Sequence, residues 1–415
     1  MSKIKPFKGL RPVPDKAEQV ASPPYDVLNS DEARAMAQGN PLSFLHVVKP
    51  EIDLDRSIDL YADEVYAKGA ENLGRLQTEG VLARDEQPCL YVYAQTMRIG
   101  DRNHFQVGVL AGASVEEYEN ELIKKHEHTR PDKEADRTRH VEALGANTGP
   151  VFLTYRAEPA IDVIVSRVAE GEPTYDFTAA DGISHQLWVV DDEPTISALV
   201  EAFDAIPCSY VADGHHRSAS AAAAGRRRRE ANTSHTGDEP YNFYLAVFFP
   251  HDQLYIMDYN RVVLDLAGLS ENEFLDRVGE KFEVAPSDAP KPGRATEFGM
   301  YLGGKWYRLT AKVGTYDAGD AVNSLDVAIL QDNLLAPMLG IEDPRTDKRI
   351  DFVGGIRGTT ELERRVNEGG AVAFALFATS IEQLMAIADA GQIMPPKSTW
   401  FEPKLRSGLV VNLLD

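Results

Sequence analysis

Short apolar segments and segments with helical spacing alternate along most of the chain. Residues on both sides of the polar stretch 100–103 are rich in β-branched and aromatic side chains, which predicts two strands joined by a turn. A helix should begin near Asn29, Ser30 or Asp31, which are good N-cap residues, and end by Gly39. The strands expected in the first half are residues 89–99, 104–114, 150–157, 185–192 and 242–250, and a second helix is expected over 195–206.

In the last third of the chain, short apolar segments again alternate with segments that have helical spacing. Helices are expected over 270–282, 324–340 and 381–391, and strands over 297–313 (a pair), 350–355 and 371–380. These elements predict an α/β fold class (mixed α+β) in which mixed sheets are flanked by helices. Domain boundaries are weakly marked, because no repeat or low-complexity linker separates the elements. We expect an N-terminal α/β domain over residues 1–195, a central region over 196–300 and a C-terminal α/β region over 301–415.

Composition and charge narrow the function classes. Of 415 residues 43% are hydrophobic, yet no apolar run is long enough to span a membrane, and the N-terminus lacks a secretory signal. We therefore expect a cytoplasmic protein without a membrane partner, in which Cys89 and Cys208 are free thiols. With 43 basic and 65 acidic residues the net charge is −22, which disfavours nucleic acid as a partner. The basic run 226–229 fits a solvated helix end.

The segment Asp213-Gly214-His215-His216-Arg217 is the strongest candidate site. It lies between a short apolar strand and an alanine-rich helix, where the N–H groups and the dipole of the helix N-terminus favour a phosphate. Gly214 allows close backbone approach, Arg217 offers a planar fork of donors, and His215 and His216 can donate to phosphate oxygens. Asp213 would repel phosphate unless it holds a metal ion or the substrate, so it is the candidate metal ligand.

This turn resembles the Asp-Gly-His-x-Arg turn of free serine kinases in the ParB and sulfiredoxin-like superfamily. The resemblance implies a strand-to-helix turn that binds nucleotide phosphates, and it carries roles over to Asp213, His216 and Arg217. Over almost the whole chain the sequence is also similar to an uncharacterised prokaryotic family. The segments that carry this second resemblance are ASPPYDV, NPLSFLHVVKPE, KKHEHT, ADGHHR and MPPKSTWFEPKLRSGL.

A catalytic base is expected in the segment that Pro131 interrupts. Residues 115–146 have a helical pattern broken at Pro131, which places Glu127 near a helix end. A carboxylate among imidazoles and basic groups can stay ionised while it accepts a hydroxyl proton, so Glu127 is the candidate base. The same segment supplies His126 and Arg137 as candidate phosphate ligands, although a solvated helix end would look the same.

The C-terminal segment contributes two further candidates. Lys397 and Lys404 lie in MPPKSTWFEPK, which combines rigid prolines with hydroxyls and lysines. The segment is either a lid or phosphate clamp, or a packed extension with surface lysines. A second glycine-rich strand-to-helix turn over residues 354–360 is a weaker candidate anion site.

Three functions remain open at this point. The first is a small-molecule kinase that uses Mg²⁺ and transfers a phosphoryl group from ATP, ADP or pyrophosphate to a hydroxyl substrate, with free serine as one candidate. The second is a non-catalytic nucleotide-binding regulatory protein of the ParB type. The third is a metal-dependent hydrolase, because His126, His128, His140, His215 and His216 exceed the three ligands that a catalytic zinc needs, although no HExxH spacing is present. The sequence does not indicate the oligomeric state.

Overall fold

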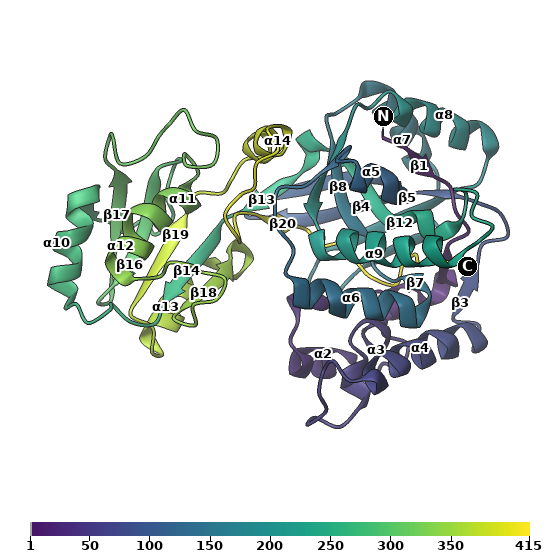
Figure 1. The fold of residues 1–415 in the computed structure, drawn as a ribbon, viewed down its shortest axis with the longest axis horizontal. Coiled ribbons are helices and arrows are strands. Elements are labelled where there is room, and N and C mark those ends of the chain that lie inside the picture. Colours follow the sequence, from purple (N-terminus) through teal and green to yellow (C-terminus); the bar gives the residue numbers. More distant parts are fainter. Residues whose placement is uncertain (1) are drawn as a thin grey trace. The chain divides into compact units, whose positions relative to one another are not determined.

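The computed structural model describes residues 2–415 and divides into two compact units (Figure 1). Unit 1 contains the chain up to Lys125, Thr129–Leu254 and the C-terminal Pro403–Asp415, and unit 2 contains His126–His128 and Tyr255–Glu402. This division differs from the three consecutive regions expected above. One reason is that the C-terminal residues return to unit 1, where β21 (Asn412–Leu413) pairs with β7 (Ala146–Asn147).

Unit 1 is built around a nine-stranded mixed sheet. Its longest hairpin joins β4 (Leu90–Ile99) to β5 (Arg102–Ser114), as the apolar pattern predicted. The strand order is β6 (Ile123–Lys124), β11 (Ser209–Asp213), β8 (Val151–Tyr155), β12 (Phe243–Pro250), β5, β4, β10 (Ser184–Val190) and β9 (Tyr175–Thr178), with β1 (Ile4–Lys5) beside β5. Parallel and antiparallel pairs both occur, since β12 is parallel to β8 and antiparallel to β5. The expected mixed α/β class is confirmed.

Two further groups of helices complete unit 1. The helices α7 (Pro159–Ala169) and α8 (Glu193–Asp204) contribute buried apolar residues to the core of the sheet. A second core cluster lies under α2 (Ser30–Ala37), α3 (Leu45–Val48) and α4 (Asp63–Thr78). The expected start of α2 is confirmed, because the Asn29 side chain and Glu32 form a capping box.

The alanine-rich helix α9 (His215–Ala231) packs closely on α6 (Pro131–Leu144) and α5 (Val115–Glu119) (Figure 1). Its buried face consists of small residues from Ser218 to Gly225. A methyl group at Gly225 would lie 2.5 Å from the backbone oxygen of Tyr241, so the helix has no room for a larger side chain there. The composition of α9 thus follows from close approach to its neighbours.

Unit 2 contains a six-stranded sheet that is antiparallel throughout. The order is β15 (Phe282–Pro286), β17 (Lys305–Ala311), β16 (Glu297–Leu302), β19 (Val372–Leu376), β14 (Tyr259–Val263) and β18 (Ile350–Gly354). The remaining elements are α10 (Glu271–Lys281), α11 (Asp326–Leu330), a π-helical turn (Gln331–Leu335), α12 (Ala336–Leu339), α13 (Gly358–Asn367), α14 (Ile381–Asp389) and the paired strands β13 (Tyr255–Met257) and β20 (Trp400–Glu402).

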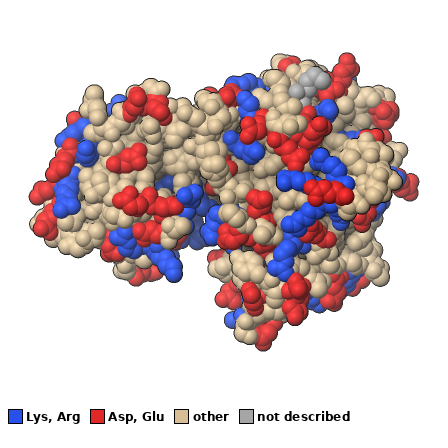
Figure 2. Space-filling model, viewed as in Figure 1, with Lys and Arg blue, Asp and Glu red and all other residues tan. Residues whose placement is uncertain are grey.

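Acidic and basic side chains are interspersed over the face drawn in Figure 2. The basic run at the end of α9 follows this pattern, because each of its arginines is paired with a carboxylate. Arg226 and Arg229 pair with Glu119, Arg227 pairs with Glu142, and Arg228 pairs with Asp415. Three acidic residues thus engage the four arginines and offset most of their charge, which argues against a phosphate-backbone contact there. Within residues 2–415 no helix has the length and apolarity required to cross a bilayer.

A pair of glycine substitutions tests the close packing of α9. Alanine has a helix propensity about 1 kcal/mol better than that of glycine. We expect Gly74→Ala in α4, where nothing lies within 4 Å, to raise the free energy of unfolding by up to this amount. Gly225→Ala should instead lower it, because of the contact with Tyr241. Denaturant unfolding measures both, and an equal gain in the two variants would contradict the packing.

Candidate functional site

The turn after β11 has a backbone that only glycine adopts readily. The pairing of β11 with β8 shifts register between Val211 and Asp213, so a bulge precedes the turn. Gly214 follows with φ 97° and ψ 30°, in the left-handed region. The first helical bond of the ladder runs from Ser218 N to Gly214 O, at 3.0 Å. The amides of residues 215–217 therefore precede the ladder, and such amides are the ones that a helix offers to an anion.

Asp213 is the last residue of β11, and both oxygens of its carboxylate accept hydrogen bonds. Its Oδ1 accepts from the Gly214 amide at 2.8 Å, and its Oδ2 accepts from Lys404 Nζ at 2.8 Å. Burial opposes ionisation of Asp213, but Lys404, Arg217 and His215 outweigh it and lower the pKa to about 2. The Asp213 side chain is still 38% exposed, so solvent and ligands reach it.

Arg217 projects from the first turn of α9 and is fixed by several neighbours. Its Nη1 donates to Pro150 O at 3.0 Å, and its guanidinium lies over the Tyr25 ring, 5.3 Å from the centroid. Asp26 approaches its Nη2 at 3.9 Å. A side chain at Gly149 would lie 2.5 Å from Arg217 Nη1, so this glycine makes room for the guanidinium. The segment after Pro23-Pro24 thus brings Tyr25 and Asp26 to Arg217.

A small pocket opens beside these groups in unit 1. Asp213, Gly214, Arg217 and Lys404 all line it, together with Pro24, Asp26, Pro150, Phe152 and Leu405. Two fixed cations and a helix N-terminus therefore face one opening, where they can neutralise an anion in an acidic protein. Asp213 fits a metal ion poorly in this arrangement, because Lys404 already holds its Oδ2 and Gly214 its Oδ1.

A neighbouring pocket holds the second predicted arginine. Arg217 and Arg137 both line it, and the Arg137 guanidinium lies 4.3 Å from the centroid of the same Tyr25 ring. Arg137 pairs with Asp136 at 2.7 Å. His140 also lines this pocket, where burial and Arg137 lower its pKa to about 3, so the imidazole is neutral at physiological pH. Arg137 is thus beside the turn, although its charge is already paired.

The loop that carries Glu127 reaches the turn at its C-terminal end. Arg130 N and His216 Nε2 form a hydrogen bond of 3.1 Å, and Pro131 then opens α6 at its first position. The expected break at Pro131 is confirmed as the beginning of a helix.

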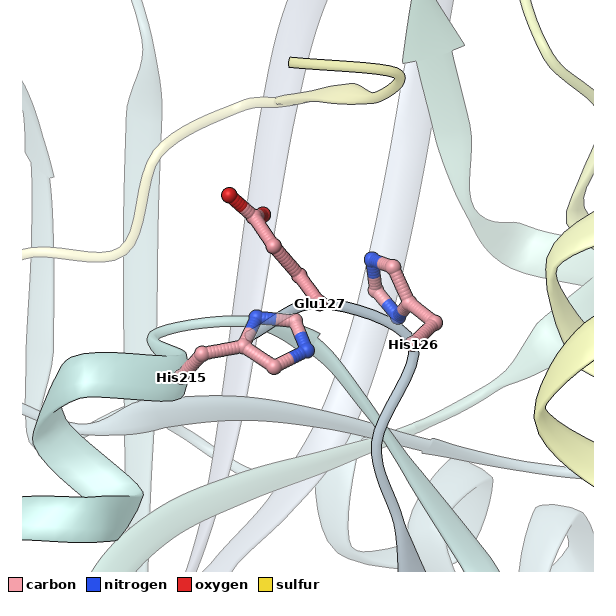
Figure 3. A group of neighbouring side chains, drawn as sticks. All are labelled: His126, Glu127 and His215. Atoms are coloured by element: carbon pink, nitrogen blue, oxygen red, sulfur yellow. The ribbon is translucent and has the colours of Figure 1, made fainter. Parts of the chain in front are cut away.

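His126, Glu127 and His215 form a possible ligand group (Figure 3). One ligand atom from each lies within 4.8 Å of the others. Two imidazoles and a carboxylate are a donor set that suits zinc. The segment 126–128 is counted with unit 2, whereas Lys125 and Thr129 on either side of it belong to unit 1.

The structure assigns the two predicted lysines of the C-terminal segment to different units. Lys397 belongs to unit 2, while Lys404 belongs to unit 1, because the C-terminal segment passes from one unit to the other after Glu402.

The glycine-rich turn over residues 354–360 is filled by its own neighbours. A methyl group at Gly354 would lie 2.7 Å from the Trp400 ring, and one at Gly355 would lie 2.4 Å from Asp258 Oδ1. These two glycines therefore serve packing. The anion site expected over residues 354–360, which include the start of α13 at Gly358, stays a prediction.

Two residues that position Arg217 were not singled out from the sequence. Gly149 provides the space and Pro150 the carbonyl acceptor. Their Gly-Pro dipeptide is a turn signal directly before β8, so it was visible as a turn. Its contact with Arg217 could not be read from the local pattern, because Arg217 lies 67 positions later in the chain.

Comparisons with known proteins identify the family. Residues 4–328 match the family described as "Protein of unknown function (DUF1015)". The chain belongs to this family. Membership confirms the expected relation to an uncharacterised family, while the chemistry of the DGHHR turn stays a prediction. No curated protein matches the sequence.

Several solved structures share some likeness with this family member. A free serine kinase in complex with AMP has 13% identity and a TM-score of 0.36, and covers 73% of this chain and 91% of its own. A mutant of that kinase in complex with ADP has 12% identity, the same coverage and a TM-score of 0.37. SbnI with a C-terminal truncation, from Staphylococcus aureus, has 13% identity and a TM-score of 0.41, and covers 73% of this chain and 87% of its own.

Removal of Lys404 tests the electrostatics of the turn. In Lys404→Met we expect the pKa of Asp213 to rise, because burial then opposes a smaller set of cations. The folded protein should consequently lose the stability that an ionised Asp213 adds above about pH 4. Carbon-13 NMR titration of labelled aspartate measures the shift. Lys5→Met, which breaks an exposed pair with Asp238, is the control and should leave Asp213 unchanged.

Proposed function

We propose that this DUF1015 member is a small-molecule phosphotransferase that binds the phosphates of its donor at the turn from Asp213 to Arg217. The observation that carries the proposal is the pocket in which Arg217, Lys404 and the N-terminus of α9 converge. A phosphoryl group requires positioning and neutralisation of charge more than it requires covalent chemistry, and these groups supply both. ATP, ADP and pyrophosphate are the candidate donors.

Each group at the turn has a distinct task in this proposal. Arg217 is held by Pro150 and Tyr25, so its guanidinium loses little conformational entropy when it binds phosphate oxygens. Lys404 bridges the Asp213 carboxylate and the donor. His215 and His216, at the first positions of α9, donate to the same phosphates. Mg²⁺ enters with the donor and reduces the charge of its phosphates.

Glu127 is the proposed base. It accepts the proton of the acceptor hydroxyl, for which free serine is the first candidate. The hydrogen bond between Arg130 N and His216 Nε2 supports this role, since it fixes the chain three residues after Glu127 to the turn. Asp213 is the alternative base, but its low pKa and its ion pair with Lys404 make it a weak proton acceptor.

Assay of the purified chain tests the reaction itself. We expect a phosphorylated product when the protein is incubated with Mg²⁺, one of the three donors and a panel of amino acids that includes serine. Mass spectrometry detects the product. Absence of product with every donor would contradict the phosphotransferase.

Two variants separate binding from chemistry. Arg217→Met should weaken donor binding on the order of tenfold to a hundredfold, the value of charge-assisted hydrogen bonds. Arg226→Met, on the same helix but paired with Glu119 at the surface, is the matched control and should bind like the parent. Glu127→Gln should abolish turnover while donor binding, measured by calorimetry, survives. If the unmodified protein binds nucleotide but shows no phosphoryl transfer, the protein is a nucleotide-binding regulator instead.

A metal-dependent hydrolase is the second candidate, favoured by the ligand group of His126, Glu127 and His215. Elemental analysis distinguishes it from the kinase. We expect the purified protein to contain no stoichiometric zinc and its turnover to require Mg²⁺. Stoichiometric zinc that disappears together with activity in His126→Ala would favour the hydrolase and exclude Glu127 as the general base of a kinase.

A further inference from the structure

Unit 2 buries an arginine that lacks a carboxylate partner. Arg261, on β14, is 4% exposed. Within residues 2–415 it forms no ion pair, and its hydrogen bonds go to the backbone oxygens of Tyr259 and Lys397, the latter at 3.0 Å. Its guanidinium also lies over the Phe352 ring, 5.0 Å from the centroid. Burial lowers the pKa of Arg261 to about 10, and Tyr259 opposes this shift only in part.

Such a cation is costly unless a ligand supplies the missing charge. A buried charge is ordinarily paired, because desolvation penalises it heavily. Two of the five N–H donors of an arginine are used by the two carbonyls. The guanidinium thus retains the capacity to bind an anionic group.

Arg261 lines a pocket that lies entirely within unit 2. The pocket has a volume of about 300 Å³, at the lower end of the range for small-molecule sites. Its apolar lining includes Val327, Leu335 and Pro396. It is therefore large enough for a small metabolite and has an arginine in its wall.

The pocket wall around Pro396 is held in a strained conformation. Lys397 adopts φ 60°, which is uncommon for a residue with a side chain. Three hydrogen bonds hold this turn: Arg261 to Lys397 O, Ser398 Oγ to Pro395 O at 2.6 Å, and Thr379 Oγ1 to Ser398 O at 3.0 Å. The MPPKST segment, for which a lid or phosphate clamp and a packed extension were both left open, thus contributes Pro395 and Pro396 to the wall of the Arg261 pocket.

The charges of the pocket select among anions. Glu342 and Asp343 also line it. Asp343 is neutralised by Arg345 at 2.8 Å, whereas Glu342 is exposed and forms no ion pair within the described residues. An unpaired carboxylate would repel a doubly charged phosphate but would attract an ammonium group. One wall therefore suits a carboxylate and another suits a cation.

We infer that this pocket binds a free amino acid, with the ligand carboxylate on Arg261 and its ammonium group on Glu342. The apolar residues of the lining contact the side chain of the ligand, and the volume restricts the ligand to a small one. This site is separate from the phosphate turn of unit 1 and does not depend on the proposed function.

Calorimetry on the full chain tests the site with each of the twenty L-amino acids, with propionate and with inorganic phosphate. We expect at least one amino acid to bind saturably. Arg261→Lys should weaken binding of that amino acid at least tenfold, because a single ammonium group cannot replace the planar guanidinium. Glu342→Gln should weaken binding of the amino acid by a similar factor. It should leave the binding of propionate unchanged, since propionate has no ammonium group. Glu342 is exposed, so this variant should fold even if Arg261→Lys does not.

Controls separate this site from the turn and from general destabilisation. Arg365→Met, which removes a paired arginine of unit 2, should bind the amino acid like the parent, and so should Arg217→Met. The inference is overturned if no amino acid binds, if both Arg261→Lys and Glu342→Gln bind like the parent, or if phosphate binds in an Arg261-dependent manner while amino acids do not. Amino-acid binding lost in Arg217→Met would place the ligand at the turn and would also overturn it.

Discussion

The ion pair between Asp213 and Lys404 organises the candidate site of unit 1. A half-buried carboxylate at a strand end requires a counter-charge, and the residue that supplies it, Lys404, comes from the C-terminal segment. The same contact brings the C-terminal segment to the turn and places a second cation beside Arg217. Without it, Asp213 would oppose the anion that the helix N-terminus favours.

Close packing is the second constraint on this site. The glycines and alanines of the region have a geometric reason: Gly214 allows the left-handed turn, Gly149 makes room for Arg217, and Gly225 lets α9 lie against its neighbours. Because the helix cannot move outward or inward without loss of these contacts, its N-terminus stays at the end of β11. The positions of the groups proposed to bind phosphate are thus set by packing before any ligand arrives.

The two units use arginine differently. In unit 1, Arg137 pairs with Asp136, and Arg217 lies near Asp26 and on Tyr25, so these cations are stabilised by the protein. In unit 2, Arg261 has carbonyl and ring partners but no carboxylate partner among residues 2–415. A buried cation without a carboxylate partner is stabilised further when an anion binds to it, which is the basis of the site inferred in unit 2.

The sequence by itself determined the fold class, most elements and the turn. Strand and helix signals depend on neighbours within a few positions, so the hairpin of β4 and β5, the cap of α2 and the strand-to-helix passage at Gly214 were all predictable. Tertiary structure alone decided which residues meet. Lys404 lies 191 positions after Asp213, and Pro150 lies 67 positions before Arg217. The same holds for Gly354 and Gly355, whose close neighbours Trp400 and Asp258 come from distant positions in the chain. Local patterns record backbone preference, whereas the partner of a charge or the occupant of a gap is set by chain segments that the pattern does not contain.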